Sequence, residues 1–138
     1  MSSSNIDLRK SSSREIANEA VKVLLEKKGL DIRLYDVTEK SPITDFYVNA
    51  TGRSTTQVSA LADDVVERLQ ECGVPCMRIE GKRDNNWLLV DFGDVIVNVF
   101  DPATRQFYDF DRHLPEDARC DIDDLIAEVD EKFDLTRK

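Results

Sequence analysis

The chain has 138 residues, a length that fits one domain around one hydrophobic core. Its 28 acidic against 19 basic residues give a net charge of −9, which opposes direct, sequence-specific binding to nucleic acid and suits a basic protein partner. The plainer interpretation of this acidity, that it keeps the protein soluble, stays open. Apolar residues make up 41% of the chain, yet no apolar run approaches the roughly 20 residues that a membrane span requires.

The N-terminal segment is polar and rich in serine, so we predict that residues 1–11 form a flexible tail. It contains acidic residues and no apolar stretch that could act as a signal peptide, and we therefore expect a cytoplasmic location. The three cysteines, Cys72, Cys76 and Cys120, form an odd set that favours reduced thiols. Because the chain has one histidine, His113, and no second pair of ligands, we expect neither a metal site nor a cofactor.

The first half of the chain predicts two amphipathic helices with two strands between them. The first helix follows the tail, where Ser12 and Glu15 form a capping box, and Gly29 ends it. The second helix begins at another capping box, formed by Ser54 and Gln57. Between them, the extended runs DIRLYDVT and DFYVNATG are separated by the turn-forming EKSPIT and predict two strands.

The second half predicts three more strands and a last helix. PCMRIEG forms a short strand, and NNWLLVDFGDVIVNVF, residues 85–100, forms two strands joined by a turn. Asp101 as N-cap and Pro102 at the first helical position indicate a short helical turn, and CDIDDLIAEVDEKF predicts the final helix. The order is helix, two strands, helix, three strands, helix. It predicts a single α/β domain with a mixed five-stranded sheet on which the helices pack.

A two-residue turn at Gly93 and Asp94 sets the register of the hairpin in residues 85–100, with Trp87 opposite Phe100. Because neighbouring side chains on a strand alternate, the residues divide between two faces. One face is apolar throughout and is predicted to be core: Leu88, Val90, Phe92, Val95, Val97 and Val99. The other face mixes aromatic, apolar and polar side chains: Trp87, Leu89, Asp91, Ile96, Asn98 and Phe100. This second face suits a surface that binds a partner, and a covering helix, such as the C-terminal one, is an equal alternative.

Two carboxylates near this turn, Asp91 and Asp94, raise the alternative of a metal-dependent nucleotidyltransferase, whose strand carboxylates stand two residues apart. Residues two apart share a face of a strand, whereas Asp91 and Asp94 are three apart, so they do not form a side-by-side metal clamp. The TGRSTT stretch at 51–56 is similar to a phosphate-cradling loop, but a helix cap at Ser54 explains it equally well. The residues therefore favour a protein that is not an enzyme, and the nucleotidyltransferase stays as the alternative.

Four ordered stretches together carry a family resemblance: SPITDFYVNATGRSTTQVSALADDVVERL, IEG, NNWLLVDFGDVIVNVF and RQFYDFDRHL. Over residues 14–114 the chain resembles the ribosomal silencing factor family, also called the Iojap-related family. The resemblance implies a nucleotidyltransferase-like fold without catalysis. It also implies binding to the large ribosomal subunit through ribosomal protein fourteen, which blocks joining of the small subunit and lowers translation when nutrients are scarce. Family members often form homodimers, and a homodimeric adaptor stays as a third possibility.

For individual positions, the resemblance implies a partner-binding surface built around the hairpin. Aromatic side chains would anchor the contact, and nearby carboxylates would favour a basic partner. Asn98 stands where the family usually has histidine, and His113 with Leu114 replaces its final Leu-Trp. We predict a domain over residues 12–114, followed by an acidic helical extension over residues 115–138 whose role stays open. The expected partner-binding residues are Trp87, Asp91, Asn98, Phe100, Tyr108, Asp109 and Asp111.

Overall fold

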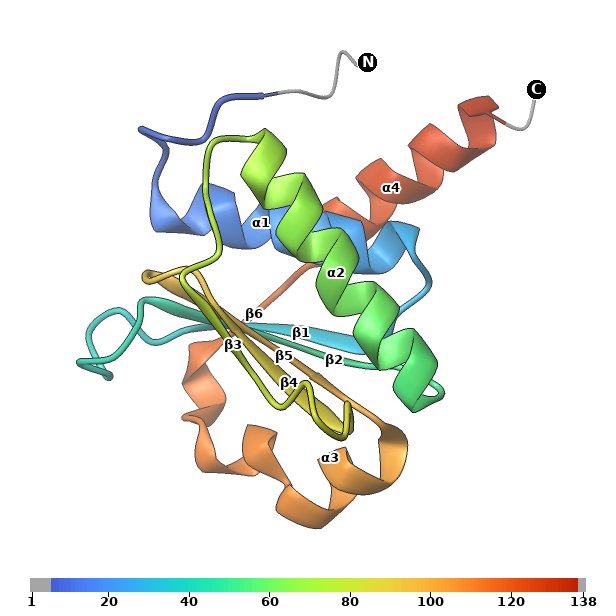
Figure 1. Cartoon of the computed structure of the whole chain (residues 1–138). Coiled ribbons are helices and arrows are strands. Elements are labelled where there is room, and N and C mark those ends of the chain that lie inside the picture. Colours follow the sequence, from blue (N-terminus) through green and yellow to red (C-terminus); the bar gives the residue numbers. More distant parts are fainter. Residues whose placement is uncertain (1–5, 137–138) are drawn as a thin grey trace.

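The computed structural model describes residues 6–136 and is built on one mixed sheet of six strands, in the order β3-β4-β5-β2-β1-β6. The strands are β1 (Leu30–Asp36), β2 (Phe46–Thr51), β3 (Arg78–Glu80), β4 (Trp87–Asp91), β5 (Val95–Phe100) and β6 (Arg119–Cys120). The β2–β5 pair is parallel and the other pairs are antiparallel. Helices α1 (Ser13–Glu26) and α2 (Thr55–Glu71) lie on one face of the sheet, and α3 (Pro102–Tyr108) lies on the other (Figure 1).

The predicted α/β class is confirmed, but the predicted number of five strands is wrong. A sixth strand, β6, pairs antiparallel with β1, with Cys120 opposite Leu34 and Arg119 opposite Tyr35. Two residues are too short to show the alternation by which a strand is predicted from sequence. The strand forms because the chain passes along the free edge of β1, which only the folded sheet provides.

The helix caps follow the sequence closely and differ from it in two details. Both hydrogen bonds of the predicted capping box between Ser12 and Glu15 are present at the start of α1. At the end of α1 the residue with left-handed backbone is Lys28, at φ 68, and not the predicted Gly29. At the start of α2 the Ser54 hydroxyl accepts from the backbone N–H of Gln57, as predicted. The Gln57 side chain, however, accepts from the backbone N–H of Arg53 at 2.6 Å and not from that of Ser54, as a capping box would require.

The hairpin of β4 and β5 has the register that the sequence predicts. Trp87 pairs with Phe100, and the Phe92 amide donates to the carbonyl of Val95 at 2.9 Å across the turn. Gly93 in this turn has φ 94, a backbone conformation that side chains rarely allow. The six residues predicted for the core face are all buried beneath α1 and α2: Leu88, Val90, Phe92, Val95, Val97 and Val99. This half of the fold therefore follows from local alternation alone.

The N-terminal segment contributes a core residue, although residues 1–11 were predicted to be a flexible tail. Leu8 is 4% exposed, and its amide donates to the carbonyl of Cys72 at 2.8 Å, at the end of α2. The apolar side chain at position 8 covers a part of the core that the helices leave open. Residues 1–5 of the predicted tail, like residues 137–138 of the predicted extension, lie outside the described residues.

The C-terminal helix α4 (Asp123–Thr136) packs on α1 and not on the sheet (Figure 1). Val129 is 4% exposed, and two ion pairs join the helices: Lys22 Nζ to Glu128 Oε2 at 2.8 Å and Lys132 Nζ to Glu26 Oε2 at 3.0 Å. The hypothesis that this helix covers the second face of the hairpin is therefore wrong. Over residues 6–136, none of the helices combines the length and the apolar character that crossing a membrane requires.

Candidate docking surface

The sheet face opposite α1 and α2, here called the outer face, is covered in part by α3 and the short 3-10 helix η1 (Phe110–His113). The side chain of Asp101 caps α3 by accepting from the Thr104 amide at 2.7 Å, with Pro102 at the first helical position as the sequence predicts. The helix ends at Asp109, whose backbone is left-handed at φ 51. This turn brings the chain back over the sheet, where the Phe110 ring lies 5.3 Å from that of Tyr47.

Aromatic rings gather where α3 meets the first residue of β4. The ring centroid of Trp87 lies 4.9 Å from that of Phe100 and 5.2 Å from that of Tyr108. The Phe107 ring meets the Tyr108 ring edge-on, with 5.0 Å between their centroids. Phe100 is completely buried, whereas Trp87 is half-buried, Tyr108 is 52% exposed and Phe107 is 80% exposed. We call Trp87, Phe107 and Tyr108 the aromatic surface, because these three rings reach solvent together.

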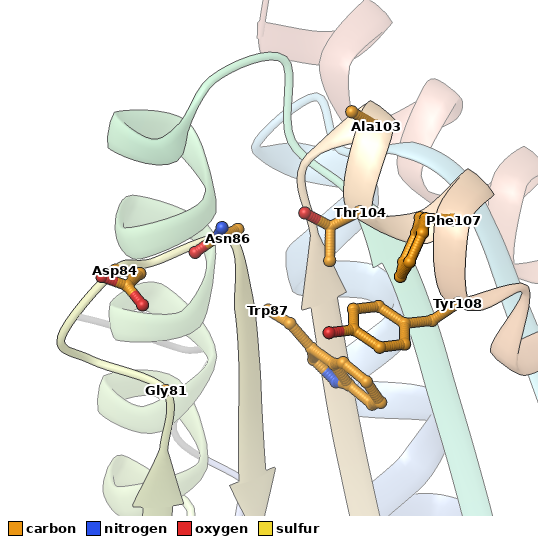
Figure 2. A pocket seen from close by; sticks show the side chains of 8 residues that line it. All are labelled: Gly81, Asp84, Asn86, Trp87, Ala103, Thr104, Phe107 and Tyr108. Carbon is orange, nitrogen blue, oxygen red and sulfur yellow. The ribbon is translucent and has the colours of Figure 1, made fainter.

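The aromatic surface forms one wall of a hollow with a volume of about 570 Å³. Figure 2 shows the Trp87 indole beside the Tyr108 ring, with Phe107 next to Tyr108 on the same helix. The opposite wall comes from the connection between β3 and β4, which contributes Asp84 and Asn86. The full lining is Gly81, Asp84, Asn86, Trp87, Ala103, Thr104, Phe107 and Tyr108. The hollow therefore combines an aromatic wall with a polar one.

The three predicted carboxylates occupy different environments. Asp91 lies at the far end of β4 from Trp87, where one carboxylate oxygen accepts from the Gly93 amide at 2.7 Å and closes the hairpin turn. The side chain of Asp109 is 49% exposed beside Tyr108 and lies 3.6 Å from a guanidinium nitrogen of Arg112. Asp111 has a side chain only 10% exposed. Of these three, Asp109 is the carboxylate that lies next to the aromatic surface and reaches solvent.

A chain of hydrogen bonds, buried at its centre, begins at Trp87 and runs beneath the aromatic surface. The indole Nε1 of Trp87 donates to Oδ1 of Asn98 at 2.9 Å, and Nδ2 of Asn98 donates to Oδ1 of Asn49 at 3.1 Å. Nδ2 of Asn49 then donates to Oδ1 of Asp111 at 2.8 Å. We call these four residues the polar relay. Both asparagines are fully buried, so Asn98 lies beneath the surface and not on it.

The polar relay ends on an ion pair. Arg105 donates from Nε to Oδ2 of Asp111 at 2.9 Å and from Nη2 to Oδ1 at 3.2 Å, and the Tyr35 hydroxyl donates to Oδ1 at 3.1 Å. Burial raises the pKa of the Asp111 carboxyl, but hydrogen bonds from Arg105 and Asn49 outweigh burial and lower the pKa below its ordinary value. Burial also raises the pKa of Tyr35 above its ordinary value. At neutral pH the relay therefore ends on a charged carboxylate.

The structure brings five of the seven predicted residues into contact with the aromatic surface or the polar relay: Trp87, Asn98, Phe100, Tyr108 and Asp111. Asp109 follows Tyr108 directly in the chain, and Asp91 lies apart at the hairpin turn. Sequence reasoning missed Phe107, Asn49 and Arg105. Asn49 carries the clearest signal, because its amide stands between the apolar Val48 and Ala50 in the middle of β2. Its partner Asn98 lies directly across the parallel pair of strands.

The two residues of the alternative enzyme lie at the turn between β4 and β5, with Asp91 at the end of β4 and Asp94 within the turn. The Asp91 carboxylate is bound to the Gly93 amide, and Asp94 is exposed. The carbonyl of Asp94 accepts from the amides of Asp45 and Phe46 at 3.0 and 3.1 Å, which joins the turn to the start of β2. Both residues thus have a structural part in connecting β4, β5 and β2.

Comparison with family models finds one that matches residues 10–137, described as ribosomal silencing factor during starvation. The match extends beyond the stretch 14–114 on which the resemblance rests, and it includes α4. Almost all of the described chain therefore falls within one family model.

Individual relatives agree with this match. Ribosomal silencing factor RsfS of Chromobacterium violaceum is 40% identical over 98 residues, which cover 71% of this chain and 80% of that protein. The mouse protein named mitochondrial assembly of ribosomal large subunit protein 1 is 30% identical over 112 residues, which cover 79% of this chain but 48% of its own length. A chloroplastic Iojap protein of Zea mays is 31% identical over 90 residues.

Two solved structures have the same fold over most of their length. A crystal structure of a protein from Chromobacterium violaceum has a TM-score of 0.71 at 39% identity and covers 73% of this chain and 84% of that one. A crystal structure of a protein from Bacillus halodurans has a TM-score of 0.64 at 30% identity and covers 78% of this chain and 95% of that one. The sequence and structure comparisons thus point to the same group of proteins.

Proposed function

The chain belongs to the ribosomal silencing factor family, and from this premise we propose that it represses translation by binding the large ribosomal subunit and preventing the small subunit from joining. Its direct partner on the large subunit is ribosomal protein fourteen, and it acts in the cytoplasm when nutrients are scarce. Sequence-specific contact with nucleic acid has no part in this proposal. The observation that carries the proposal is the aromatic surface, three neighbouring rings that reach solvent on an acidic chain.

The aromatic surface has the properties of an anchor for a protein partner. Aromatic side chains dominate the energy of many protein interfaces because they bury a large area and lose little conformational freedom. Phe107 is 80% exposed and packs edge-on against Tyr108, and Trp87 is held by Phe100 beneath it. Because these rings are already in place before binding, little further ordering is needed when a partner arrives.

The charge around the aromatic surface suits a basic partner. Asp84 lies in the hollow beside Trp87, and the half-exposed Asp109 follows Tyr108. The net charge of −9 would also attract a basic ribosomal protein at long range and speed association. The proposal therefore predicts that association becomes slower as salt is added.

Co-sedimentation with purified large ribosomal subunits tests the docking surface. The variant with both Phe107→Ala and Tyr108→Ala is expected to bind at least about 30-fold more weakly, because an aromatic anchor commonly contributes about 2 kcal/mol or more. A matched control replaces Ile43 and Met77 by alanine. Each of these is 69% exposed and neither lines the hollow. Equal binding by the aromatic variant and the control, both folded, would show that the docking surface lies elsewhere.

A subunit-joining assay tests the silencing step separately. Mixed large and small subunits are separated by size after incubation with increasing amounts of the chain. The proposal expects the joined fraction to fall, and expects the fall to require the aromatic surface. Binding to large subunits without any effect on joining would contradict a silencing function and would leave only the binding function.

The two alternatives from the sequence have their own tests. The proposal regards the nucleotidyltransferase-like fold that the resemblance implies as a scaffold without catalysis. Magnesium-dependent nucleotide turnover that Asp94→Asn abolishes would contradict this. A homodimeric adaptor would show the mass of a dimer that large subunits do not compete apart. A dimer that large ribosomal subunits do dissociate would mean that dimerisation and ribosome binding use the same surface. The proposal is compatible with that result.

A further inference from the structure

The polar relay on the outer face has a fixed direction. Its first member, the Trp87 indole, can only donate a hydrogen bond, and its last member, the ionised Asp111 carboxylate, can only accept them. The two amides between them must therefore both donate toward Asp111, which settles the orientation of Asn98 and Asn49. A relay of this kind has one low-energy arrangement, and its successive bonds strengthen one another.

Apolar side chains in place of the relay would contribute at least as much stability in this part of the sheet. Ile96 and Phe100 share the outer face with Asn98 on β5 and are 4% and 0% exposed. Buried polar groups contribute little net stability compared with well-packed apolar ones of similar size, although a fully bonded polar network can specify one arrangement among several. No buried side-chain nitrogen or oxygen in the described part of the chain lacks a partner. Every buried polar side-chain atom of the relay therefore has a hydrogen-bond partner. We expect the relay to select one side-chain conformation and to add little net stability.

The arrangement that the relay selects is that of the Trp87 ring. Rotation about the bond between Cβ and the indole has two broad energy wells, and contacts with neighbouring rings do not depend strongly on which edge faces them. Phe100 and Tyr108 therefore restrict the plane of the indole without choosing its edge. The bond from Nε1 to Asn98 makes that choice, because the other orientation would leave the Asn98 oxygen buried without a donor.

The far end of the relay is held by two other elements, α3 and β1. Arg105 on α3 donates to Asp111, to the carbonyl of Asp31 at 2.8 Å and to the hydroxyl of Thr51 at 2.9 Å. Tyr35 on β1 also donates to Asp111. The relay thus connects two features of the outer face. One is the Arg105–Asp111 ion pair, which attaches α3 to the sheet, and the other is the partly exposed ring of Trp87.

We propose that Asn98, Asn49 and Asp111 are positioning residues that hold the indole of Trp87 in one of its two orientations and so shape the aromatic surface. The use of that orientation for binding rests on the proposed function. The orientation itself does not, and it is measurable in the free chain.

The decisive measurement uses the single tryptophan of the chain, whose indole N–H gives one nuclear magnetic resonance signal. In the unsubstituted protein this N–H is expected to exchange with solvent slowly, as a hydrogen-bonded group does. The isosteric variant Asn98→Leu is expected to speed indole exchange. It should also weaken co-sedimentation with large subunits about tenfold, which corresponds to 1.4 kcal/mol.

Asn98→His serves as the rescue variant. A neutral imidazole has one donor and one acceptor, so it can accept from the indole and donate to Asn49. Slow indole exchange and full binding are expected to return. Thr44→Val is the matched control: it removes a buried hydroxyl that is bonded to the carbonyl of Phe46, away from the relay, and should change neither readout.

Rapid indole exchange in the unsubstituted protein would overturn the inference, as would a folded Asn98→Leu variant with an unchanged indole signal. If Asn98→Leu does not fold, the unsubstituted protein and Asn98→His decide the question by themselves. If Asn98→Leu frees the indole and binding to large subunits is unchanged, the positioning role is supported and the proposed docking surface is wrong. The two proposals can therefore fail separately.

Discussion

Arg105 on α3 and Asp111 on η1 form a buried ion pair, with Nε 2.9 Å from Oδ2 and with side chains 9% and 10% exposed. Six positions separate the two residues in the chain, and the left-handed turn at Asp109 between them brings the charges together. Both partners also bond to the sheet, Arg105 to Thr51 and Asp111 to Asn49. This pair therefore attaches the whole covering segment to the outer face.

Removing one partner of this pair should destabilise the fold strongly. In Asp111→Ala the buried guanidinium of Arg105 loses its nearest counter-charge and keeps the half-exposed Asp31 carboxylate at 3.8 Å, so the free energy of unfolding should fall by about 3 kcal/mol. Urea denaturation measures the change. The matched control is Asp109→Asn, which removes the exposed pair with Arg112, a contribution of less than about 1 kcal/mol, and keeps a side chain that tolerates the left-handed backbone at this position. Similar losses for both variants would contradict the importance of the buried pair.

The same carboxylate should give stability a defined pH dependence. The pKa of Asp111 is lowered in the folded chain from the ordinary value of 3.8 that it regains on unfolding. A carboxyl with a lowered folded pKa contributes its full stabilisation above 3.8 and loses it as the pH falls through the folded value. Urea denaturation at successive pH values below about 4 should therefore show a shallower dependence for Asp111→Asn than for the unsubstituted chain. Parallel curves would contradict this.

Phe100 beneath the aromatic surface and Phe107 within it should differ greatly in their contribution to stability. Phe100 is 0% exposed, so Phe100→Ala should lower the free energy of unfolding by about 3–5 kcal/mol through the cavity it leaves. Phe107 is 80% exposed, so Phe107→Ala should change stability by less than about 0.5 kcal/mol. Thermal and urea denaturation of both variants checks the contrast. A large loss of stability in Phe107→Ala would show that this ring supports the fold, and binding experiments with it would then need reinterpretation.

Val129 should contribute strongly to the attachment of the C-terminal helix. Val129 is 4% exposed against α1, and Val129→Ala should weaken the attachment of α4 by about 2 kcal/mol. Hydrogen exchange should then accelerate in α4 before it does in the sheet. Ile126→Ala is the control, because Ile126 is 36% exposed and shares the helix. Equal acceleration by both variants would mean that Val129 has no special part in holding α4.

Local patterns predicted much of this fold correctly. The hairpin register from Trp87 to Phe100, its apolar core face, the capping box of α1 and the Asp101 cap of α3 all appear as expected. Each depends on residues within a few positions of one another, so alternation and capping rules are sufficient. The family assignment also came from stretches of sequence, and the family model confirms it.

The errors share one physical cause, which is that the deciding partner is distant in the chain. Leu8 is buried because its amide meets Cys72, and β6 exists because it reaches the edge of β1. The second face of the hairpin was expected either to bind a partner or to be covered by a helix, such as the C-terminal one; a helix does cover part of it, but a different one. This face is covered by α3 and η1, since only the folded chain shows where the left-handed turn at Asp109 directs them.

The sequence by itself determined the main helices, five of the six strands, the hairpin with its two faces, the acidic charge and the family, because these properties are local or summed over the chain. Tertiary structure decided which of the expected contact residues reach solvent. Phe100, Asn98 and Asp111 lie inside, while Phe107 joins Trp87 and Tyr108 outside. The polar relay joins residues 49, 98 and 111, which lie on three elements far apart in sequence, and only folding brings their hydrogen-bonding groups within reach of one another.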